Sequence, residues 1–287
     1  MGFSSIDDLV NEITTNGKFL KAPYQKVSNN AINSAAGRWH ETLQWNGNPA
    51  AVTLTGTAGT AVALNDATSG AWYHGGNVAA DTKHILSALA MSPSAGIVPA
   101  TAILCDFLVN YPSLVVTGTP STLTPTALTR YTSGEGVQAI VSVVGALGAS
   151  QPALTFTYTD QGGVAGNVAG ACAPPVASAP ASTLFQDLAT GAGGPFVRLA
   201  AGDRGIRSVQ SYALATGTTG TASLMLVRPL ATIPLLAINT ASERDYLYQL
   251  PSLPQVVDGA CLGWIIQVGS TMGPSSVFLS TLDLGWG

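Results

Sequence analysis

The sequence predicts an all-β fold, a β-sandwich or jelly-roll-like domain that carries a short N-terminal helical arm. Apolar and polar residues alternate along many short segments, and this period of two is typical of half-buried strands. Turns rich in glycine and proline separate the segments, and about ten strands at such spacing indicate a sandwich, jelly roll or barrel. Only 9% of the 287 residues are charged, against about 25% in an average soluble domain. The surface is therefore expected to be neutral, covered by partners, or both.

The first predicted element is a helix that starts after Ser5. Ser5 and Asp8 have the spacing of a capping box, and Gly17 supplies a stop. An apolar stripe follows the cap at helical spacing and consists of Ile6, Leu9, Val10 and Ile13. A helix of three turns is marginal alone, so the stripe is expected to dock on its own domain or on a neighbouring subunit. We expect residues 1–50 to be an arm, with irregular chain after the helix.

Residues 51–287 are predicted to form one β-sandwich domain. In residues 154–159, Leu, Phe and Tyr alternate with Thr, which indicates a strand with a threonine outer face. Three more segments alternate in the same way, namely 52–55, 102–110 and 261–268. Other runs are apolar on both faces, as expected for strands covered on both sides; they are 84–91, 137–144, 206–214, 222–228 and 276–283. The Ala- and Leu-rich stretches 83–91 and 139–149 could also be helices, and we prefer strands.

Residues 161–195 differ from the rest of the chain in composition. They consist mostly of Gly, Ala, Pro and Ser, and Asp187 is the one charged residue among them. Such a segment cannot build a core of its own, and long loops of this kind are usually functional or disordered. We expect an extended loop that becomes ordered against a neighbouring subunit.

The sequence does not predict an active site, a cofactor site or a metal site. His40 and Glu41 begin like a zinc-protease motif, but Gln44 stands where the second histidine would be needed. His74 starts a His-Gly-Gly run like that of lipases, yet the chain has no Gly-x-Ser-x-Gly elbow. The three cysteines are an odd number at wide spacing, which suggests neither a disulfide framework nor a zinc site. We therefore expect the chain not to be an enzyme.

Charge and hydropathy limit the partners. A net charge of −4 argues against nucleic-acid binding, which normally requires a basic surface. The sequence has no apolar run long enough to span a membrane. Acidic residues stand near the N-terminus where a signal peptide would carry lysines, so synthesis in a cytoplasm is expected.

The few charges occur in two tight clusters of mixed sign. One cluster contains Asp203, Arg204 and Arg207; the other contains Glu243, Arg244 and Asp245. They are either ion pairs between subunits or local pairs that stabilise turns. In a chain with so few charges they are candidates for assembly contacts, together with the apolar stripe of the helix.

Several short segments resemble virion structural proteins of tailed phages, of the head decoration (cement) type. They include Ala-Gly-Asp-Arg-Gly-Ile-Arg-Ser-Val-Gln at 201–210, Leu-Val-Arg-Pro-Leu at 226–230 and the ending Asp-Leu-Gly-Trp-Gly at 283–287. The resemblance implies a bacteriophage protein that binds the outer capsid surface and stabilises the shell. It implies localisation in the virion after synthesis in the host cytoplasm. Its partners would be copies of itself, a trimer being the first choice, and the major capsid protein or other virion proteins.

Two other functions remain open from the sequence. A receptor- or glycan-binding β-domain of a tail or surface structure would show Trp72, Tyr73 and Tyr131 together in a groove. A β-sandwich hydrolase would need a pocket that brings His74 or His40 next to an acid.

Overall fold

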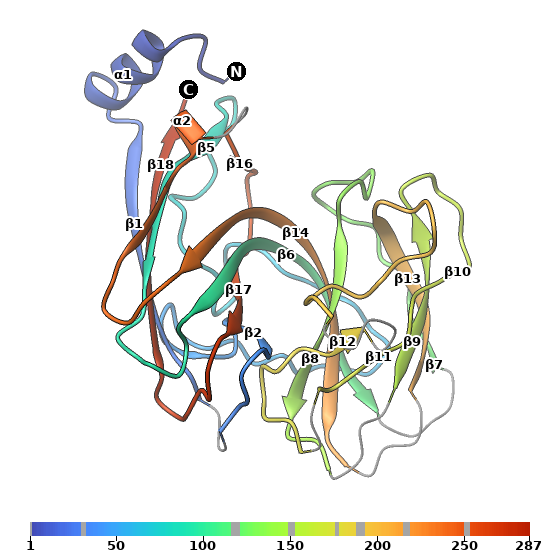
Figure 1. Ribbon diagram of the computed structural model, residues 1–287. Coiled ribbons are helices and arrows are strands. Elements are labelled where there is room, and N and C mark those ends of the chain that lie inside the picture. Colours follow the sequence, from blue (N-terminus) through green and yellow to red (C-terminus); the bar gives the residue numbers. More distant parts are fainter. Residues whose placement is uncertain are drawn as a thin grey trace.

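The computed structural model describes residues 2–29, 33–115, 121–148, 153–175, 178–187, 193–214, 219–249 and 253–287. It confirms the all-β prediction, because three six-stranded sheets make up the body of the chain. Figure 1 shows two lobes side by side, joined by the long strands β6 and β14 that run across the middle. We call the three sheets the central, terminal and distal sheets.

The central sheet has the strand order β2-β17-β6-β14-β8, with β4 paired to β6. Its strands are β2 (Trp39–Glu41), β17 (Leu262–Val268), β6 (Ala100–Val115), β14 (Thr221–Leu235), β8 (Gln138–Gly145) and β4 (Val62–Ala63). All of these pairs are antiparallel, and β6 and β14 are paired over almost their whole length. The two longest strands therefore hold both lobes on one frame.

The terminal sheet contains the first and last strands of the chain and covers one end of the central sheet. Its order is β15-β5-β18-β1-β3, with β16 paired to β5. Its elements are β15 (Ser242–Asp245), β5 (Lys83–Met91), β18 (Val277–Trp286), β1 (Phe19–Val27), β3 (Asn46–Asn48) and β16 (Gln255–Val256), and the short helix α2 (Tyr246–Gln249) follows β15. Its inner face packs on β17 through a core that includes Ile85, Phe278 and Trp264.

The distal sheet covers the other end of the central sheet, with the order β12-β11-β9-β13-β7 and with β10 paired to β9. Its strands are β12 (Gln186–Asp187), β11 (Cys172–Ala173), β9 (Leu154–Asp160), β13 (Ile206–Leu214), β7 (Ser121–Thr122) and β10 (Asn167–Val168). Phe156 and Tyr158 of β9 pack on Leu224 and Val141 of the central sheet. Their threonine neighbours lie on the opposite, half-exposed face, as the sequence predicts.

A third core lies on the opposite face of the central sheet. There Phe107, Met225 and Ile265 meet side chains such as Leu43 and Leu54, which come from the loops after β2. Residues 183–184 close this core, because they bridge the two edge strands of the sheet, with Thr183 opposite His40 of β2 and Leu184 opposite Ser142 of β8. The central sheet thus curls into a nearly closed layer around its third core.

The helix predicted after Ser5 is confirmed as α1 (Ile6–Thr14). The Ser5 hydroxyl accepts a hydrogen bond from the Asp8 amide at 3.0 Å, which is the first half of a capping box. The Asp8 carboxylate instead accepts from the amide and hydroxyl of Ser4. Gly17 has a φ of +66°, as a glycine that ends a helix requires.

The chain after the helix is not irregular, so this expectation is wrong for residues 19–27. Phe19–Val27 forms β1, which pairs with β18 along all nine residues. Residues 52–55, predicted as a strand, are not part of any sheet ladder, although Leu54 is buried. The stretch 83–91 is a strand, as preferred, and so is the first part of 139–149, through Gly145.

Described parts of the segment 161–195 pack on their own chain, and the ordering of this segment against a neighbouring subunit stays a prediction. Leu184 donates a backbone hydrogen bond to Trp39 at 2.8 Å, and Phe185 donates one to Val141 at 2.8 Å. Both side chains are buried. Residues 176–177 and 188–192 of this segment lie outside the described residues. The sequence gives the segment few core residues, and those few are used to join the edges of the central sheet.

Candidate functional site

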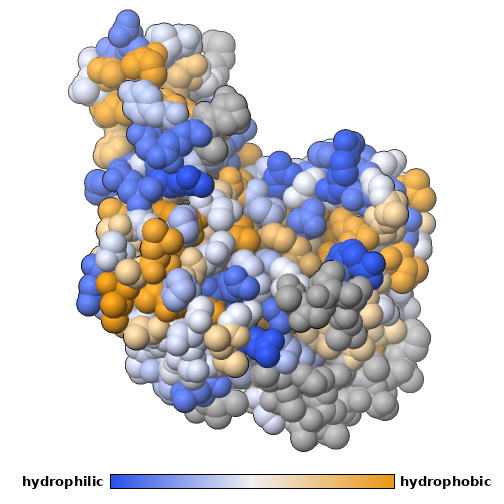
Figure 2. All heavy atoms as spheres, viewed as in Figure 1, coloured by the Kyte–Doolittle hydropathy of each residue, from blue (hydrophilic) through white to orange (hydrophobic). Residues whose placement is uncertain are grey.

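The apolar stripe of α1 is only partly covered by its own chain. Leu9 is buried and Ile13 is half-buried, whereas Ile6 and Val10 are each 51% exposed. Figure 2 shows hydrophobic residues at the surface over α1, in the upper part of the molecule. The helix therefore docks on its own domain through Leu9 and Ile13, whereas Ile6 and Val10 on the other side of the stripe face solvent.

The helix is nevertheless held firmly at the end of the terminal sheet. Lys18, just beyond its C-terminus, pairs with Glu12 at 2.9 Å and with Asp81 at 2.8 Å, and these carboxylates raise the pKa of its ammonium. The Lys18 carbonyl also accepts a hydrogen bond from Trp286 of β18. The phenyl ring of Phe3 lies 5.9 Å from the ring of His84. A helix that is already folded and docked on its own chain reduces the ordering cost of binding another surface through its exposed apolar residues.

The cluster of Asp203, Arg204 and Arg207 forms contacts within its own chain. The Tyr158 hydroxyl donates to Asp203, and the Arg207 guanidinium donates to the backbone carbonyl of Gln161 at 2.7 Å. Arg204 pairs with Glu135 at 3.2 Å, but both side chains are largely exposed. These contacts tie together three loops at the end of the distal lobe, as local pairs do.

The cluster of Glu243, Arg244 and Asp245 lies on the edge strand β15. The Asp245 carboxylate accepts hydrogen bonds from the amides of Leu247 and Tyr248, so it caps α2. Glu243 is exposed, whereas Arg244 is half-buried and lines a hollow between β15 and β14. The structure therefore separates the roles of the three residues.

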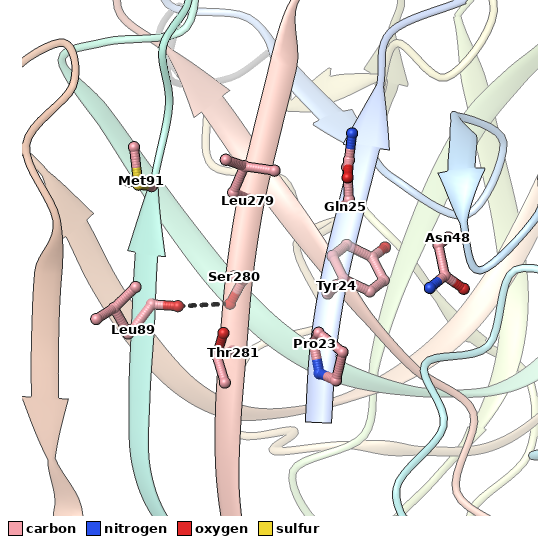
Figure 3. A pocket seen from close by; sticks show the side chains of 9 residues that line it. All are labelled: Pro23, Tyr24, Gln25, Asn48, Leu89, Met91, Leu279, Ser280 and Thr281. Carbon is pink, nitrogen blue, oxygen red and sulfur yellow. Dashed lines mark hydrogen bonds between the residues drawn. The ribbon is translucent and has the colours of Figure 1, made fainter. Parts of the chain in front are cut away.

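The outer face of the terminal sheet carries a shallow hollow of about 320 Å³. Figure 3 shows its lining from three adjacent strands: Leu89 and Met91 from β5, Leu279 from β18, and Pro23 from β1. Ser280 turns away from it, and its hydroxyl donates to the Leu89 carbonyl at 2.8 Å. This face thus offers a shallow hollow rather than a deep pocket, and the ion pair of Lys21 and Asp283 lies between the hollow and the end of the sheet that carries α1.

His40 and His74 form hydrogen bonds with hydroxyl and ammonium groups rather than with carboxylates. His40 is fully buried; its Nε2 lies 2.8 Å from the Ser34 hydroxyl and its Nδ1 3.4 Å from that of Ser182. His74 Nδ1 accepts a hydrogen bond from Lys83 at 3.0 Å. Burial lowers the pKa of His40 to about 3 and, together with the Lys83 charge, that of His74 to about 4. In the described part of the chain, neither imidazole is thus hydrogen-bonded to a carboxylate as the hydrolase alternative requires.

Burial of neutral His40 predicts a loss of stability in acid. The pKa of histidine in an unfolded chain is about 6.5, so the unfolded state gains a proton before the folded state does. The contribution of His40 is therefore lost as the pH falls from about 6.5 toward about 3. Between pH 7 and pH 5, the wild type should lose about 2 kcal/mol more than His40→Gln. Urea unfolding at both pH values checks this; equal losses would contradict it.

A buried ion pair between the lobes was missed at the level of sequence. Asp106 of β6 is fully buried, and Arg130 binds it through two nitrogens at 2.8 and 2.9 Å. Arg130 also donates to the carbonyls of Leu64 and Phe107. These carbonyls lie where the strand beside β6 changes from β17, which pairs up to Asp106, to β4, which pairs from Val109. A charged residue inside an apolar strand was the available signal, but its partner lies in a distant loop.

The three aromatic residues that a glycan groove would require do not lie together on the surface. Trp72 is buried and its ring lies 4.6 Å from that of Tyr24. Tyr131 is partly buried beneath Arg228, whose guanidinium carbon is 5.6 Å from its ring. Tyr73 is 67% exposed. The structure thus leaves one exposed aromatic of the three.

Within the described ranges, no group of three or more His, Cys, Asp or Glu residues could hold a metal ion. No helix in the described part of the chain is long and apolar enough to cross a membrane. The three cysteines are free and buried.

No protein-family model matches the chain, and no curated protein matches it. Among solved structures it is similar to VP1 of trichodysplasia spinulosa-associated polyomavirus, at 9% identity and a TM-score of 0.24 over 94% of this chain and 95% of that chain. The same VP1 in complex with 3'-sialyllactose aligns over the same shares at 9% identity and a TM-score of 0.23. The infectious bursal disease virus Gt strain aligns at 8% identity and a TM-score of 0.20, over 93% of this chain and 80% of that chain. Likeness at this level carries no conclusion about function.

Proposed function

We propose that the chain is a non-enzymatic structural protein that assembles with copies of itself and with other proteins of a virion. The observation that carries this proposal is α1, a capped and anchored helix that keeps Ile6 and Val10 exposed. Exposed apolar residues on a rigid element are expected where a partner covers them. The low charge of the chain supports the same function, since charged residues are depleted at the centres of protein interfaces.

Within a virion, the proposed role is that of a decoration protein that binds the outer capsid surface and stabilises the shell. The resemblance of residues 201–210 and 226–230 to such proteins supports this role. The mechanism is mechanical: each 1,000 Å² of apolar area buried across neighbouring capsid subunits contributes up to about 25 kcal/mol before the costs of association. A protein that binds the assembled shell and not its free subunits stabilises the shell by linkage.

The helix stripe provides a direct test of assembly. We expect Val10→Asp to raise the protein concentration at which half of the chains are assembled by about tenfold or more, because docking would bury an unpaired charge. The measurement is molar mass against concentration for the purified chain, with a trimer as the first expectation for the wild type.

Asn11→Asp is the matched control, because it places the same charge on the next, exposed position of the helix and leaves the stripe intact. It should assemble like the wild type. A wild-type chain that stays monomeric at every concentration, or two variants that behave alike, would rule out self-assembly through the stripe.

The decoration role has its own test in the binding of the purified chain to isolated capsid shells from the virus that encodes it. We expect wild type and Asn11→Asp to sediment with the shells and to raise the temperature at which the shells open. If the chain stays in the supernatant at saturating concentration, the decoration role is wrong even where self-assembly is intact.

A further inference from the structure

A hollow of about 340 Å³ opens at the edge of the sandwich between the central and terminal sheets. Its lining consists of Pro229, Leu230, Ala231, Thr232, Arg244 and Tyr246. The first four belong to β14, beyond Val227, where β14 ceases to pair with β8. The other two belong to β15 and α2. β14 on one side, and β15 with α2 on the other, thus line a cleft whose β14 wall is mostly apolar and whose opposite wall carries the two polar side chains Arg244 and Tyr246.

Arg244 points toward the inside of the sandwich. It pairs with Ala88 of β5, a core residue of the inner face, and residues directly opposite on paired strands share a face. Glu243 and Asp245 therefore lie on the outer face, where Asp245 caps α2. Among the described residues, no carboxylate lies within ion-pair distance of Arg244. The inner face of this edge thus carries a positive charge without a counter-charge.

Tyr246 places a second unmatched donor at the same cleft. Its side chain is 1% exposed, and its hydroxyl has no hydrogen-bond partner in the described part of the chain. Burial raises the pKa of this hydroxyl to about 12, while the nearby charge of Arg244 acts in the opposite direction. The phenol therefore remains protonated and available as a donor. A buried hydroxyl without a partner calls for an explanation, and a bound ion or polar group is one such explanation.

We propose that this cleft binds a carboxylate attached to a small aliphatic group. The Arg244 guanidinium and the Tyr246 hydroxyl donate to the two carboxylate oxygens, and the aliphatic group packs on Pro229, Leu230 and Ala231. A guanidinium matches a carboxylate in both charge and planar geometry. The ligand is either a free carboxylate or an acidic side chain of an assembly partner, and both present the same chemistry to the cleft.

The probe for this site is 4-methylpentanoate, compared with its neutral amide, 4-methylpentanamide, in NMR titrations of the full chain. The wild type is expected to bind the carboxylate about tenfold or more tightly than the amide. Arg244→Gln should remove this preference, and Tyr246→Phe should weaken carboxylate binding about two- to tenfold. Arg204→Gln, which removes an exposed arginine already paired with Glu135, is the control and should bind like the wild type.

Equal affinities for carboxylate and amide, or a preference that survives in Arg244→Gln, would overturn the proposal. In that case the inward charge serves to discourage edge-to-edge pairing of β15, as charges on edge strands do. Thermal unfolding of each variant shows whether it is folded before the titration is interpreted. If a second copy supplies the carboxylate, Arg244→Gln also lowers the assembled mass; if a free ligand does, assembly is unchanged while probe binding by the wild type still depends on Arg244.

Discussion

Replacing Arg130 by Met is expected to lower the free energy of unfolding by about 3–5 kcal/mol, because it leaves the Asp106 carboxylate buried without a counter-charge. Asp106 is fully buried. Among the described residues, its carboxylate accepts hydrogen bonds from Arg130 and from the Cys261 amide, so only the amide remains when the arginine is removed. Burial already raises the pKa of Asp106 against the effect of Arg130. Without the arginine, the carboxyl must take up a proton or remain charged in an apolar surrounding. Urea unfolding at pH 7 measures the loss.

Two further variants separate the ion pair from simple loss of an arginine. Arg204→Met removes an exposed arginine that pairs with Glu135, and a surface pair of this kind contributes about 0–1 kcal/mol. The double variant Arg130→Met/Asp106→Leu removes both charges, and it should recover part of the loss. A loss below about 1 kcal/mol in Arg130→Met would show that the buried pair does not hold the lobes together.

The position of this pair explains why its effect should reach both lobes. Asp106 is the last residue of β6 that pairs with β17, just before the part of β6 that pairs with β4. Arg130 comes from the loop before β8, on the distal side, and satisfies the carbonyls of Leu64 and Phe107 at this gap. The ion pair thus replaces ladder hydrogen bonds where the neighbouring strand changes. The Arg130 side chain thus joins the loop, β6 and the residues after β4, and the Leu64 amide adds a hydrogen bond to the Leu108 carbonyl of β6 at 2.9 Å.

Local sequence pattern was sufficient for the helix and for most long strands. The cap at Ser5 and the stripe after it predict α1, because both depend on residues within one or two turns. The run 154–159 lies within β9, because alternation reports burial of one face directly, and the apolar run 206–214 coincides with β13. The run 222–228 ended too early, since β14 continues through Pro229 and Pro234. These prolines are tolerated because pairing with β8 has stopped at Val227, so that part of β14 is a sheet edge.

Strand β1 could not be recognised in this way, and the reasons are specific. Pro23 interrupts the strand pattern, and it is tolerated because β3 covers only Gln25–Val27 on that side of β1. Lys26 points inward, where its ammonium donates to the carbonyl of Trp45 at 3.0 Å. A buried lysine reads as a surface residue in the sequence, so the inner face of the strand was hidden.

The candidate sites depend on long-range pairing even more strongly. The sequence left open whether the stripe of α1 docks on its own domain or on a neighbouring subunit, since the pattern of a helix does not reveal its partner. The exposure of Ile6 and Val10 could therefore not be predicted from it. The charge cluster at 243–245 was found from composition, but the inward direction of Arg244 follows from its register with Ala88. The bridge of residues 183–184 between β2 and β8 had no local signal. The pattern of a single sequence indicates which face of a helix or strand is buried, whereas a site is formed by contacts between segments that are distant in the sequence.

Replacing Trp264 by Ala is expected to lower the free energy of unfolding by about 3–5 kcal/mol, through lost burial and the cavity that remains. Trp264 is fully buried in the core between the central and terminal sheets. Its ring lies 6.2 Å from that of Trp72 and 5.9 Å from that of Phe278. It pairs with Leu104 of β6, so its side chain joins β17 to the strand that links the lobes. Because these neighbours belong to different elements, collapse into the cavity would require several of them to move.

The chain contains its own matched control, because the triplet Leu-Gly-Trp occurs at 262–264 and again at 284–286. Trp286 is half-buried near the end of β18, where Lys83 Nζ lies 5.7 Å from its ring centre. Trp286→Ala should cost less than about 2 kcal/mol, since it removes partly exposed area and one cation–π contact. Urea unfolding with matching slopes for both variants makes the comparison. Equal losses would mean that the two sheets are held together at their ends as strongly as at the centre of their shared core.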